Sequence, residues 1–316
     1  MTFGLNERAR HLTEYAIQRA DELKISVTQI ENGGRCLDFG ANSSGGIAAG
    51  LLLARITLAD LAEVQIVDGH RGGQSWPMIQ VTTDHPVPAC LFSQYAGWQI
   101  ALDNYFAMGS GPMRAAAARE ELFEKLSYQE SANKIVGTLE TSQSPDEAVF
   151  ALIAEKTGVS AENIDLVFAP VTSLAGSLQV VARSVETALH KLLELGFDMS
   201  QLQSGLGSVP LPTVAKDDLI GIGRTNDAIL YGGDVHLWVT AENGEIEAIG
   251  PRVPSESSSA FGKPFLKIFE DADRDFYNID PHLFSPAKVT FHNLKSGDVF
   301  QFGQLRPEIL SESFGC

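Results

Sequence analysis

Apolar residues recur at helical spacing through residues 170–197, PVTSLAGSLQVVARSVETALHKLLELGF. On a helix that advances about 100° per residue they form one stripe, which is expected to pack against a core. The stripe consists of Leu178, Val181, Ala182, Val185, Leu189, Leu192 and Leu193. The same spacing predicts a row of touching polar neighbours along one flank of the stripe: Gln179, Arg183, Glu186 and His190. The segment is therefore predicted to be a single amphipathic helix with a polar edge.

Other periodic segments predict further helices and strands. Helical spacing or capping residues favour helices over residues 7–23, 40–55, 112–125 and 144–155. Strand-like stretches flank turns at Asn32-Gly33-Gly34 and at Lys295-Ser296-Gly297-Asp298, which predicts two hairpins. Residues 62–81 are also strand-like and are interrupted by a turn at residues 69–73. The apolar run of residues 163–169 is typical of a buried strand, and AILYGG and VHLWVT, after a polar loop at residues 221–227, predict two more.

This mixture of elements indicates an α+β protein. A chain of 316 residues can bury a large core and is expected to form two lobes, here placed at residues 1–130 and 131–316, which can interlock. A short internal echo supports two related lobes: Gly109-Ser110-Gly111-Pro112 follows Gly97-Trp98 much as Gly207-Ser208-Val209-Pro210 follows Gly196-Phe197. Duplicated lobes would leave a ligand cleft between them.

Net charge and cysteine content limit which partners, metal sites and cellular compartments are expected for this protein. The net charge of −17 argues against nucleic acid or an anionic membrane as the partner, because phosphate binding needs a basic face. Three widely spaced cysteines, without a Cys/His cluster, indicate a reducing compartment and no zinc site. The N-terminal segment is charged by Glu7, unlike a signal peptide, and uncharged runs are too short to span a bilayer. A cytoplasmic protein is expected.

The motifs of covalent, metal and nucleotide chemistry are missing from the sequence. It contains no GxSxG, HExxH or Walker loop, and the glycine pattern at residues 221–226 has Asn226 where a dinucleotide-binding loop needs its last glycine. What remains is acid/base and electrostatic chemistry by Arg183 and Glu186. Two interpretations of this pair stay open: an exposed helical ion pair, worth about 0.3–0.5 kcal/mol, or an acid/base pair on the wall of a cleft.

Three other polar segments also have two interpretations. The run Thr82-Thr83-Asp84-His85-Pro86 at a strand end suits either a cleft or a simple turn. Arg114, in the first turn of a helix, opposes the helix dipole unless a carboxylate or phosphate lies close by. The turn Asn42-Ser43-Ser44-Gly45-Gly46 suits either an anion or close packing of the backbone.

Several separated strings together resemble the methenyltetrahydromethanopterin cyclohydrolase family. They are VTTDHP (residues 81–86), DNYFAMGSGPMRA (103–115), ARSVETALHKLLELGFD (182–198), GRTNDAILYGG (223–233), GKPFLKIFED (262–271) and DFYNIDPHLFSPA (275–287). They occur in the family's order and span nearly the whole chain. The resemblance favours the catalytic interpretation of Arg183 and Glu186, because the family's proposed catalytic pair is also an arginine and a glutamate at these positions of the motif.

The resemblance implies a reaction, an assembly and a carrier. The reaction is reversible hydrolysis of a cationic N5,N10-methenyl group on tetrahydromethanopterin to the N5-formyl compound, in methanogenesis or formaldehyde oxidation. Tetrahydromethanopterin is then the substrate carrier, and no metal or prosthetic cofactor is implied. Glu186 is expected to take a proton from water, and Arg183 to hold Glu186 ionised and stabilise oxygen charge. The family also implies a homotrimer.

Further residues are predicted to bind the substrate. We expect the pterin ring or its anionic tail to contact Thr83, Asp84, His85, Gly109, Ser110, Gly111, Arg114, Gln179, Asn226, Asp227 and Lys263. Two alternatives remain open: a cyclohydrolase that uses a tetrahydrofolate carrier, and a pterin-binding protein without catalysis.

Overall fold

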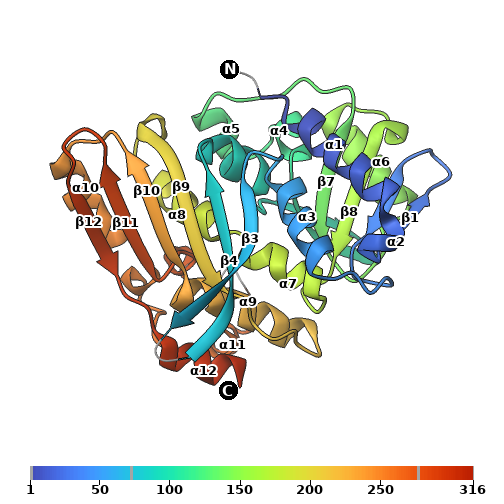
Figure 1. Ribbon diagram of the computed structural model, residues 1–316. Coiled ribbons are helices and arrows are strands. Elements are labelled where there is room, and N and C mark those ends of the chain that lie inside the picture. Colours follow the sequence, from blue (N-terminus) through green and yellow to red (C-terminus); the bar gives the residue numbers. More distant parts are fainter. Residues whose placement is uncertain (1–2, 72–73, 276–277, 316) are drawn as a thin grey trace. The chain divides into compact units, whose positions relative to one another are not determined.

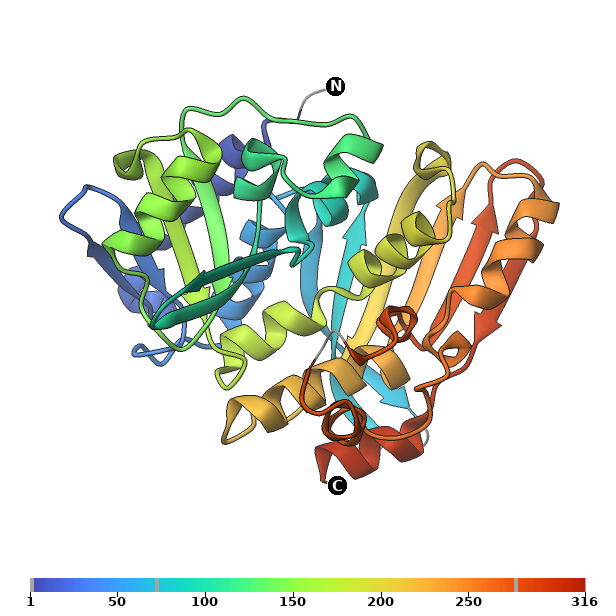
Figure 2. The same ribbon diagram turned by 180° about the vertical axis from the view of Figure 1, so that it is seen from behind.

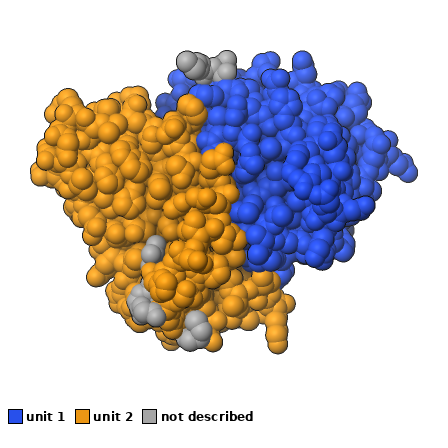
Figure 3. All heavy atoms as spheres, viewed as in Figure 1, with its two compact units in different colours: residues 1–62, 88–179 blue, residues 63–87, 180–316 orange. Residues whose placement is uncertain are grey.

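The computed structural model describes residues 3–71, 74–275 and 278–315. The chain divides into two compact units (Figure 3): the first unit contains residues 1–62 and 88–179, and the second unit residues 63–87 and 180–316. The predicted boundary near residue 130 lies inside the first unit. The first unit continues past residue 130 because the strands at residues 135–140 and 164–169 join its sheet. Residues 63–87 belong to the second unit because the strand at residues 74–83 pairs with the much later strand at residues 202–210.

The first unit is built on a six-stranded mixed sheet (Figure 1). In spatial order its strands are β1 (Ser26–Gln29), β2 (Arg35–Asp38), β8 (Ile164–Ala169), β7 (Ile135–Glu140), β6 (Tyr105–Ser110) and β5 (Trp98–Leu102). The three central strands, β2, β8 and β7, are parallel. Every residue of β8 is buried, as expected for a parallel strand with both faces covered.

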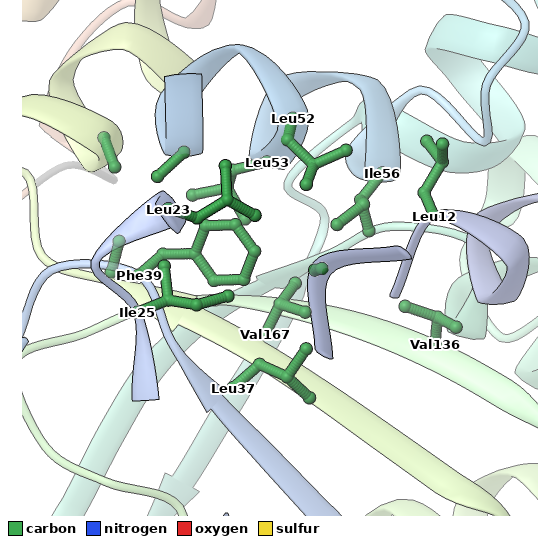
Figure 4. Packing of buried hydrophobic residues seen from close by; sticks show 14 of the residues in the cluster. Leu12, Leu23, Ile25, Leu37, Phe39, Leu52, Leu53, Ile56, Val136 and Val167 are labelled. Carbon is green, nitrogen blue, oxygen red and sulfur yellow. The ribbon is translucent and has the colours of Figure 1, made fainter. Parts of the chain in front are cut away.

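Helices cover both faces of this sheet. Their bounds are α1 (Leu5–Gln18), α2 (Ala20–Leu23), α3 (Ile47–Thr57), α4 (Met113–Ala117), α5 (Glu121–Lys125), α6 (Glu147–Thr157) and α7 (Leu174–Val181). The π-helix η1 (Val87–Gln94) and the short 3-10 helix η2 (Ala161–Asn163) complete the helical elements described in this unit. Figure 4 shows the core on one face, where Leu12 of α1 and Leu53 of α3 meet Val167 of β8. Phe150 of α6 packs on the other face with Phe168 of β8.

The second unit has its own six-stranded sheet. In spatial order the strands are β12 (Val299–Gly303), β11 (Lys288–Asn293), β10 (Asp234–Val239), β9 (Leu202–Pro210), β4 (Gln74–Thr83) and β3 (Glu63–Arg71). All neighbours are antiparallel except β10 and β11. The helical elements are α8 (Ser184–Glu194), α9 (Asp218–Gly232), α10 (Asn243–Ile249), α11 (Phe265–Asp271), α12 (Pro307–Phe314), η3 (Met199–Gln201), η4 (Gly250–Arg252), η5 (Ser255–Ser257) and η7 (Pro281–Leu283).

Most predicted elements are confirmed, and so is the α+β class with two sheet-containing lobes. The predicted loop at residues 221–227 and the predicted strand AILYGG after it are wrong, because residues 221–232 lie in α9 and Gly233 is its C-cap. A short apolar run lacks the alternation of apolar and polar residues that would distinguish a strand from a buried helix. Asp217 starts this helix by accepting a hydrogen bond from the amide of Ile220, 2.9 Å away. The cleft between lobes stays a prediction.

In the part of the chain that the structure describes, no helix is long and apolar enough to cross a membrane.

Candidate active site

The predicted amphipathic helix is two helices, α7 and α8, separated by Ala182 and Arg183. Arg183 is the N-cap of α8, and its carbonyl accepts the amide hydrogen bond of Thr187 at 2.9 Å. The predicted stripe is buried nonetheless: its first six residues have no exposed surface, and Leu193 is half-buried. The break moves Glu186 from the middle of a helix to the first turn of a new one.

Arg183 is a buried cation with unused hydrogen-bond donors. Its exposed fraction is 8%, and neither Nε nor Nη2 has a hydrogen-bond partner within the described ranges. A buried donor without an acceptor costs about 1–3 kcal/mol, and more when the group is charged. Such a guanidinium is suited to an oxygen or a negative charge brought by a ligand.

Glu186 lies one turn after Arg183 and is also buried, with an exposed fraction of 4%. The side chains between them, Ser184 and Val185, have no exposed surface. Position 186 is the third residue of α8, where the positive end of the helix dipole favours an anion. A carboxylate and a guanidinium are therefore held on one rigid turn that offers both a base and an electrostatic donor.

The predicted residues Thr83, Asp84 and His85 lie close to this turn in the second unit. Thr83 ends β4 and pairs with Gly205 of β9, on which Val185 of α8 packs. Thr83 Oγ1 accepts a hydrogen bond from the amide of His85 at 3.0 Å, and Asp84 accepts one from the hydroxyl of Ser204 at 2.7 Å. The sheet thus brings the end of β4 and the start of α8 to one place.

Three other predicted residues of the second unit serve contacts within the protein. Asn226 donates from Nδ2 to the carbonyl of Ile222, 2.8 Å away in the same helix. Lys263 forms an ion pair with Asp271. Asp227 is buried and accepts hydrogen bonds from the amide of Phe265, at 2.7 Å, and from the hydroxyl of Ser313, at 2.6 Å. Asp227 therefore fastens α11 and the C-terminal helix α12 to α9.

The titration of Asp227 should make stability depend on pH. Burial raises its pKa from the ordinary 3.8 to about 7, although hydrogen bonds from Ser313 and Phe265 oppose the shift. The folded state then holds a proton that the unfolded state releases, so stability from this group is complete below pH 4 and is lost as pH rises through 7. In urea unfolding, Asp227→Asn is expected to gain stability relative to the wild type, by on the order of a few kcal/mol, between pH 4 and pH 8.

The exposed pair of Lys263 and Asp271 offers a control for this prediction. The pKa of Asp271 is lowered by its hydrogen bond and charge interaction with Lys263, so its contribution has the opposite sign. Asp271→Asn should lose stability relative to the wild type as pH rises through the acid range. An Asp227→Asn variant with the same difference from the wild type at pH 4 and pH 8 would contradict the assignment.

The predicted residues of the first unit fall into two groups. Ser110 and Gln179 are buried, and the Ser110 hydroxyl and Gln179 Nε2 have no hydrogen-bond partner among the residues described. Gly109 and Ser110 end β6, and Gly111 has the positive φ of 86° that favours glycine in the turn into α4. Arg114, in contrast, is fully buried and all its nitrogens have partners.

The anion that the helix position of Arg114 indicated is part of the protein. Glu120 accepts from Arg114 Nε at 2.8 Å and from Nη2 at 3.0 Å, and the carbonyls of Leu91 and Ser93 accept from Nη1. The guanidinium also lies over the rings of Tyr95 and Phe123. A ligand anion would have to displace these partners, so the substrate role of Arg114 stays a prediction without structural support.

The glycine-rich turn before α3 likewise contains its own anion. The carboxylate of Asp38 accepts hydrogen bonds from four successive amides, those of residues 40–43, at 2.6–3.1 Å. The amides of Asn42 and Ser43 in the predicted turn are thus already bound by a carboxylate of the protein. A surface hollow of about 720 Å³ in the first unit, formed by the β5–β6 turn and residues before α6, contains none of the predicted site residues.

The sequence analysis missed several residues around α8. Lys191 is buried and donates to the carbonyl of His282, and burial lowers its pKa to about 8. Ser184 has a buried hydroxyl with no hydrogen-bond partner among described residues, and it lies against Gly207 of β9. The available signal was Gly207, because a glycine inside a strand often marks a place where another part of the chain approaches the backbone closely.

Comparison with known proteins gives one consistent family. The family model described as "Cyclohydrolase (MCH)" matches residues 4–314. A methenyltetrahydromethanopterin cyclohydrolase of Methanosarcina mazei is 41% identical over 99% of this chain and 98% of its own length. Proteins of the same name are 47% identical in Rhodopirellula baltica, over 90% of this chain and 86% of that protein, and 40% identical in Methylobacillus flagellatus, over 99% and 95%.

Proposed function

Because the chain belongs to the cyclohydrolase (MCH) family, and is therefore a hydrolase of C–N bonds, we propose that its substrate is N5,N10-methenyltetrahydromethanopterin. The product is N5-formyltetrahydromethanopterin, and the reaction is reversible. The observation that carries the mechanism is the first turn of α8, where buried Arg183 has unused donors beside buried Glu186. The relatives share the name methenyltetrahydromethanopterin cyclohydrolase, which supports tetrahydromethanopterin as the carrier.

The chemistry of the substrate determines what the protein must supply. The methenyl carbon lies between two nitrogens and shares a positive charge with them, so it is already electrophilic. Water adds to this carbon and loses one proton, which gives a neutral hydroxyl adduct. As the bond from carbon to N10 breaks, the adduct hydroxyl loses its proton to become the formyl oxygen, and N10 takes up one proton. The sum is one water consumed and one proton released. Because the carbon needs no further activation, we propose that no metal or prosthetic cofactor takes part.

We assign Glu186 as the base. It orients the attacking water and accepts its proton, then returns a proton to the departing nitrogen. Its position in the first turn of α8 favours the anionic form that a base needs. Its burial keeps bulk water from competing for the carboxylate.

Arg183 acts as the electrostatic partner. Its unused Nε and Nη2 donors are available to the oxygen that becomes negative in the tetrahedral adduct, and its charge favours ionised Glu186. An interaction that strengthens as the oxygen gains charge lowers the barrier more than it tightens substrate binding.

For the pterin ring we propose contacts with Thr83, Asp84 and His85, because Thr83 ends β4 beside the turn that holds the catalytic pair and the other two residues follow it directly. Gln179 and Ser110 remain candidates because each has a buried polar atom without a partner among described residues. Asn226, Asp227, Arg114 and Lys263 are weaker candidates, since the protein already uses their polar groups.

The remaining proposals follow from the family resemblance. We propose that the protein is cytoplasmic and that it is a homotrimer. Light scattering of the purified protein tests the trimer directly. The strongly acidic chain suits a cationic reacting centre, and it argues against nucleic acid as a partner.

Loss of methenyl absorbance, followed with purified protein, tests the function. We expect rapid hydrolysis of methenyltetrahydromethanopterin and much slower hydrolysis of methenyltetrahydrofolate. Equal or faster turnover of the folate compound would assign the enzyme to that carrier. Tight binding of the methanopterin compound without hydrolysis would instead indicate a pterin-binding protein.

Arg183→Lys keeps the positive charge but removes the planar fork of donors. We expect kcat to fall about 10- to 100-fold, because a single ammonium cannot replace both unused guanidinium donors at the developing oxygen. KM should change less than kcat. The measurement is steady-state hydrolysis of the methenyl substrate.

Arg252→Lys is the control for this substitution, since Arg252 is an exposed arginine of the same unit. Its kcat should equal that of the wild type. Unchanged kcat in Arg183→Lys would show that charge alone suffices and that the fork geometry has no role.

A further inference from the structure

Strand β9 carries two glycines on the face that supports the catalytic turn. Gly205, Gly207 and Val209 are buried along β9, and they alternate with Leu206 and Ser208, which are partly exposed. Helix α8 lies along β9 on this face, as Figures 1 and 2 show. The glycines therefore lie directly beneath the start of the helix that carries Arg183 and Glu186.

Neither glycine is required by its backbone conformation. Gly205 and Gly207 both lack the positive φ that only glycine adopts readily, so any residue could take their dihedral angles. The register irregularity between β9 and β10 occurs at Trp238 and Val239, beyond both glycines. Glycine at these two positions is therefore explained by space and not by chain flexibility.

The space is taken by the first turn of α8. A Cβ at position 207 would lie 2.1 Å from Ser184 Oγ, 3.1 Å from Ser184 Cβ and 3.0 Å from Val185 Cγ2. A Cβ at position 205 would lie 2.9 Å from Val185 Cγ1. Ser184 Oγ could rotate away, but Ser184 Cβ and the stiff, branched Val185 could not without moving the helix.

This contact also accounts for the unusual Ser184. Its hydroxyl is buried and has no hydrogen-bond partner in the described chain, so it does not hold the turn by a polar contact. The useful property of Ser184 is its small side chain, which fits against Gly207. Ser184 and Val185 are the two residues between Arg183 and Glu186, so any displacement of them moves both groups of the pair.

We propose that Gly205 and Gly207 are positioning residues: they let the first turn of α8 dock directly on β9, and so set the places of Arg183 and Glu186 for catalysis. This inference rests on the proposed function for its catalytic consequence. Its geometric part, the docking of the turn, stands without it. A tightly packed core transmits a displacement instead of absorbing it, and about 1 Å of misplacement can cost about 100-fold in rate.

The test is a pair of variants that forms and then relieves the clash. Gly207→Ala is expected to lower kcat about 10- to 100-fold with KM changed less than about 3-fold. Adding Ser184→Gly removes the nearest atom, Ser184 Oγ, together with Ser184 Cβ. Gly207→Ala/Ser184→Gly should therefore return to within about 3-fold of the Ser184→Gly single variant, as a double-mutant cycle requires for a direct contact.

A control separates displacement of the turn from loss of stability. Val289→Ala makes a cavity on β11, in the core of the same sheet, and should lower the melting temperature while kcat stays at the wild-type value. If Gly207→Ala fails to fold, Gly205→Ala is the milder variant, because its Cβ would be tight against one methyl group only.

Hydrogen exchange at the Thr187 amide, which is bonded to the Arg183 carbonyl, tests the docking without any activity. We expect faster exchange in Gly207→Ala and restored protection in the double variant. Wild-type exchange and kcat in Gly207→Ala, or a double variant no better than Gly207→Ala, would overturn the proposal. Changed exchange in a protein whose wild type does not hydrolyse the substrate would support the docking and reject the proposed function instead.

Discussion

Glu186→Gln is expected to lower kcat for methenyl hydrolysis by about 100- to 10,000-fold, the usual contribution of a positioned general base. Glutamine keeps the size of the side chain and its place in the first turn of α8, but it cannot accept the proton of the attacking water. Binding of the cyclic cation should be weakened less than turnover, since water is activated only after the substrate is bound. The measurement is loss of methenyl absorbance under saturating substrate.

Glu194→Gln is the matched control, because Glu194 is an exposed carboxylate at the other end of the same helix. Its kcat should equal the wild-type value, and melting curves of both variants should show intact folding. Turnover of Glu186→Gln within about 3-fold of the wild type would remove Glu186 as the base, given the size of effect expected for one.

Arg114→Met is expected to cost about 3–5 kcal/mol of unfolding free energy, because removing one partner of a buried ion pair leaves the other charge uncompensated. Arg114 has no exposed surface and Glu120 holds its Nε and Nη2 in a two-pronged contact. The carbonyls of Leu91 and Ser93 would also lose their donor. Chemical denaturation measures the loss.

Arg19→Met removes an arginine from the exposed pair with Glu22 and should cost less than about 1 kcal/mol. The comparison also decides between two roles for Arg114. A variant with a raised KM and wild-type stability would show that Arg114 binds an anionic part of the substrate, as its place in a helix first turn suggested. A large loss of stability would confirm that its anion is Glu120.

The periodicity of residues 178–193 predicted the buried face of this segment correctly, but not its break. Helix breaks have a local signal when glycine or proline causes them. Ala182 and Arg183 are neither, so no such local signal marks the end of α7 and the start of α8. The three-residue spacing of Arg183 and Glu186 follows from the sequence, but the position of Glu186 near the N-terminus of a helix could not be predicted from it.

Hairpin prediction shows the same limit at longer range. The turn predicted at residues 69–73 interrupts a strand-like segment that forms the paired strands β3 and β4. Strand β3 continues through Arg71, and residues 72 and 73 lie outside the described part of the chain. Nothing in the hairpin indicates that Thr83 pairs with Gly205 of β9. That distant pairing assigns residues 63–87 to the second unit, and it brings Thr83 to the turn that carries Arg183 and Glu186.

By itself, the sequence determined the α+β class, most helices and strands, and, through its separated strings, the family and the residue pair to examine. These features depend on local periodicity and on residue identity, which the chain carries directly. Only the tertiary structure decided which polar groups remain without a partner. Arg114 and Asp227 are satisfied by Glu120 and Ser313, whereas Nε and Nη2 of Arg183 have no partner among the described residues. The physical reason is that hydrogen-bond satisfaction depends on groups far apart in the chain, which meet only after folding.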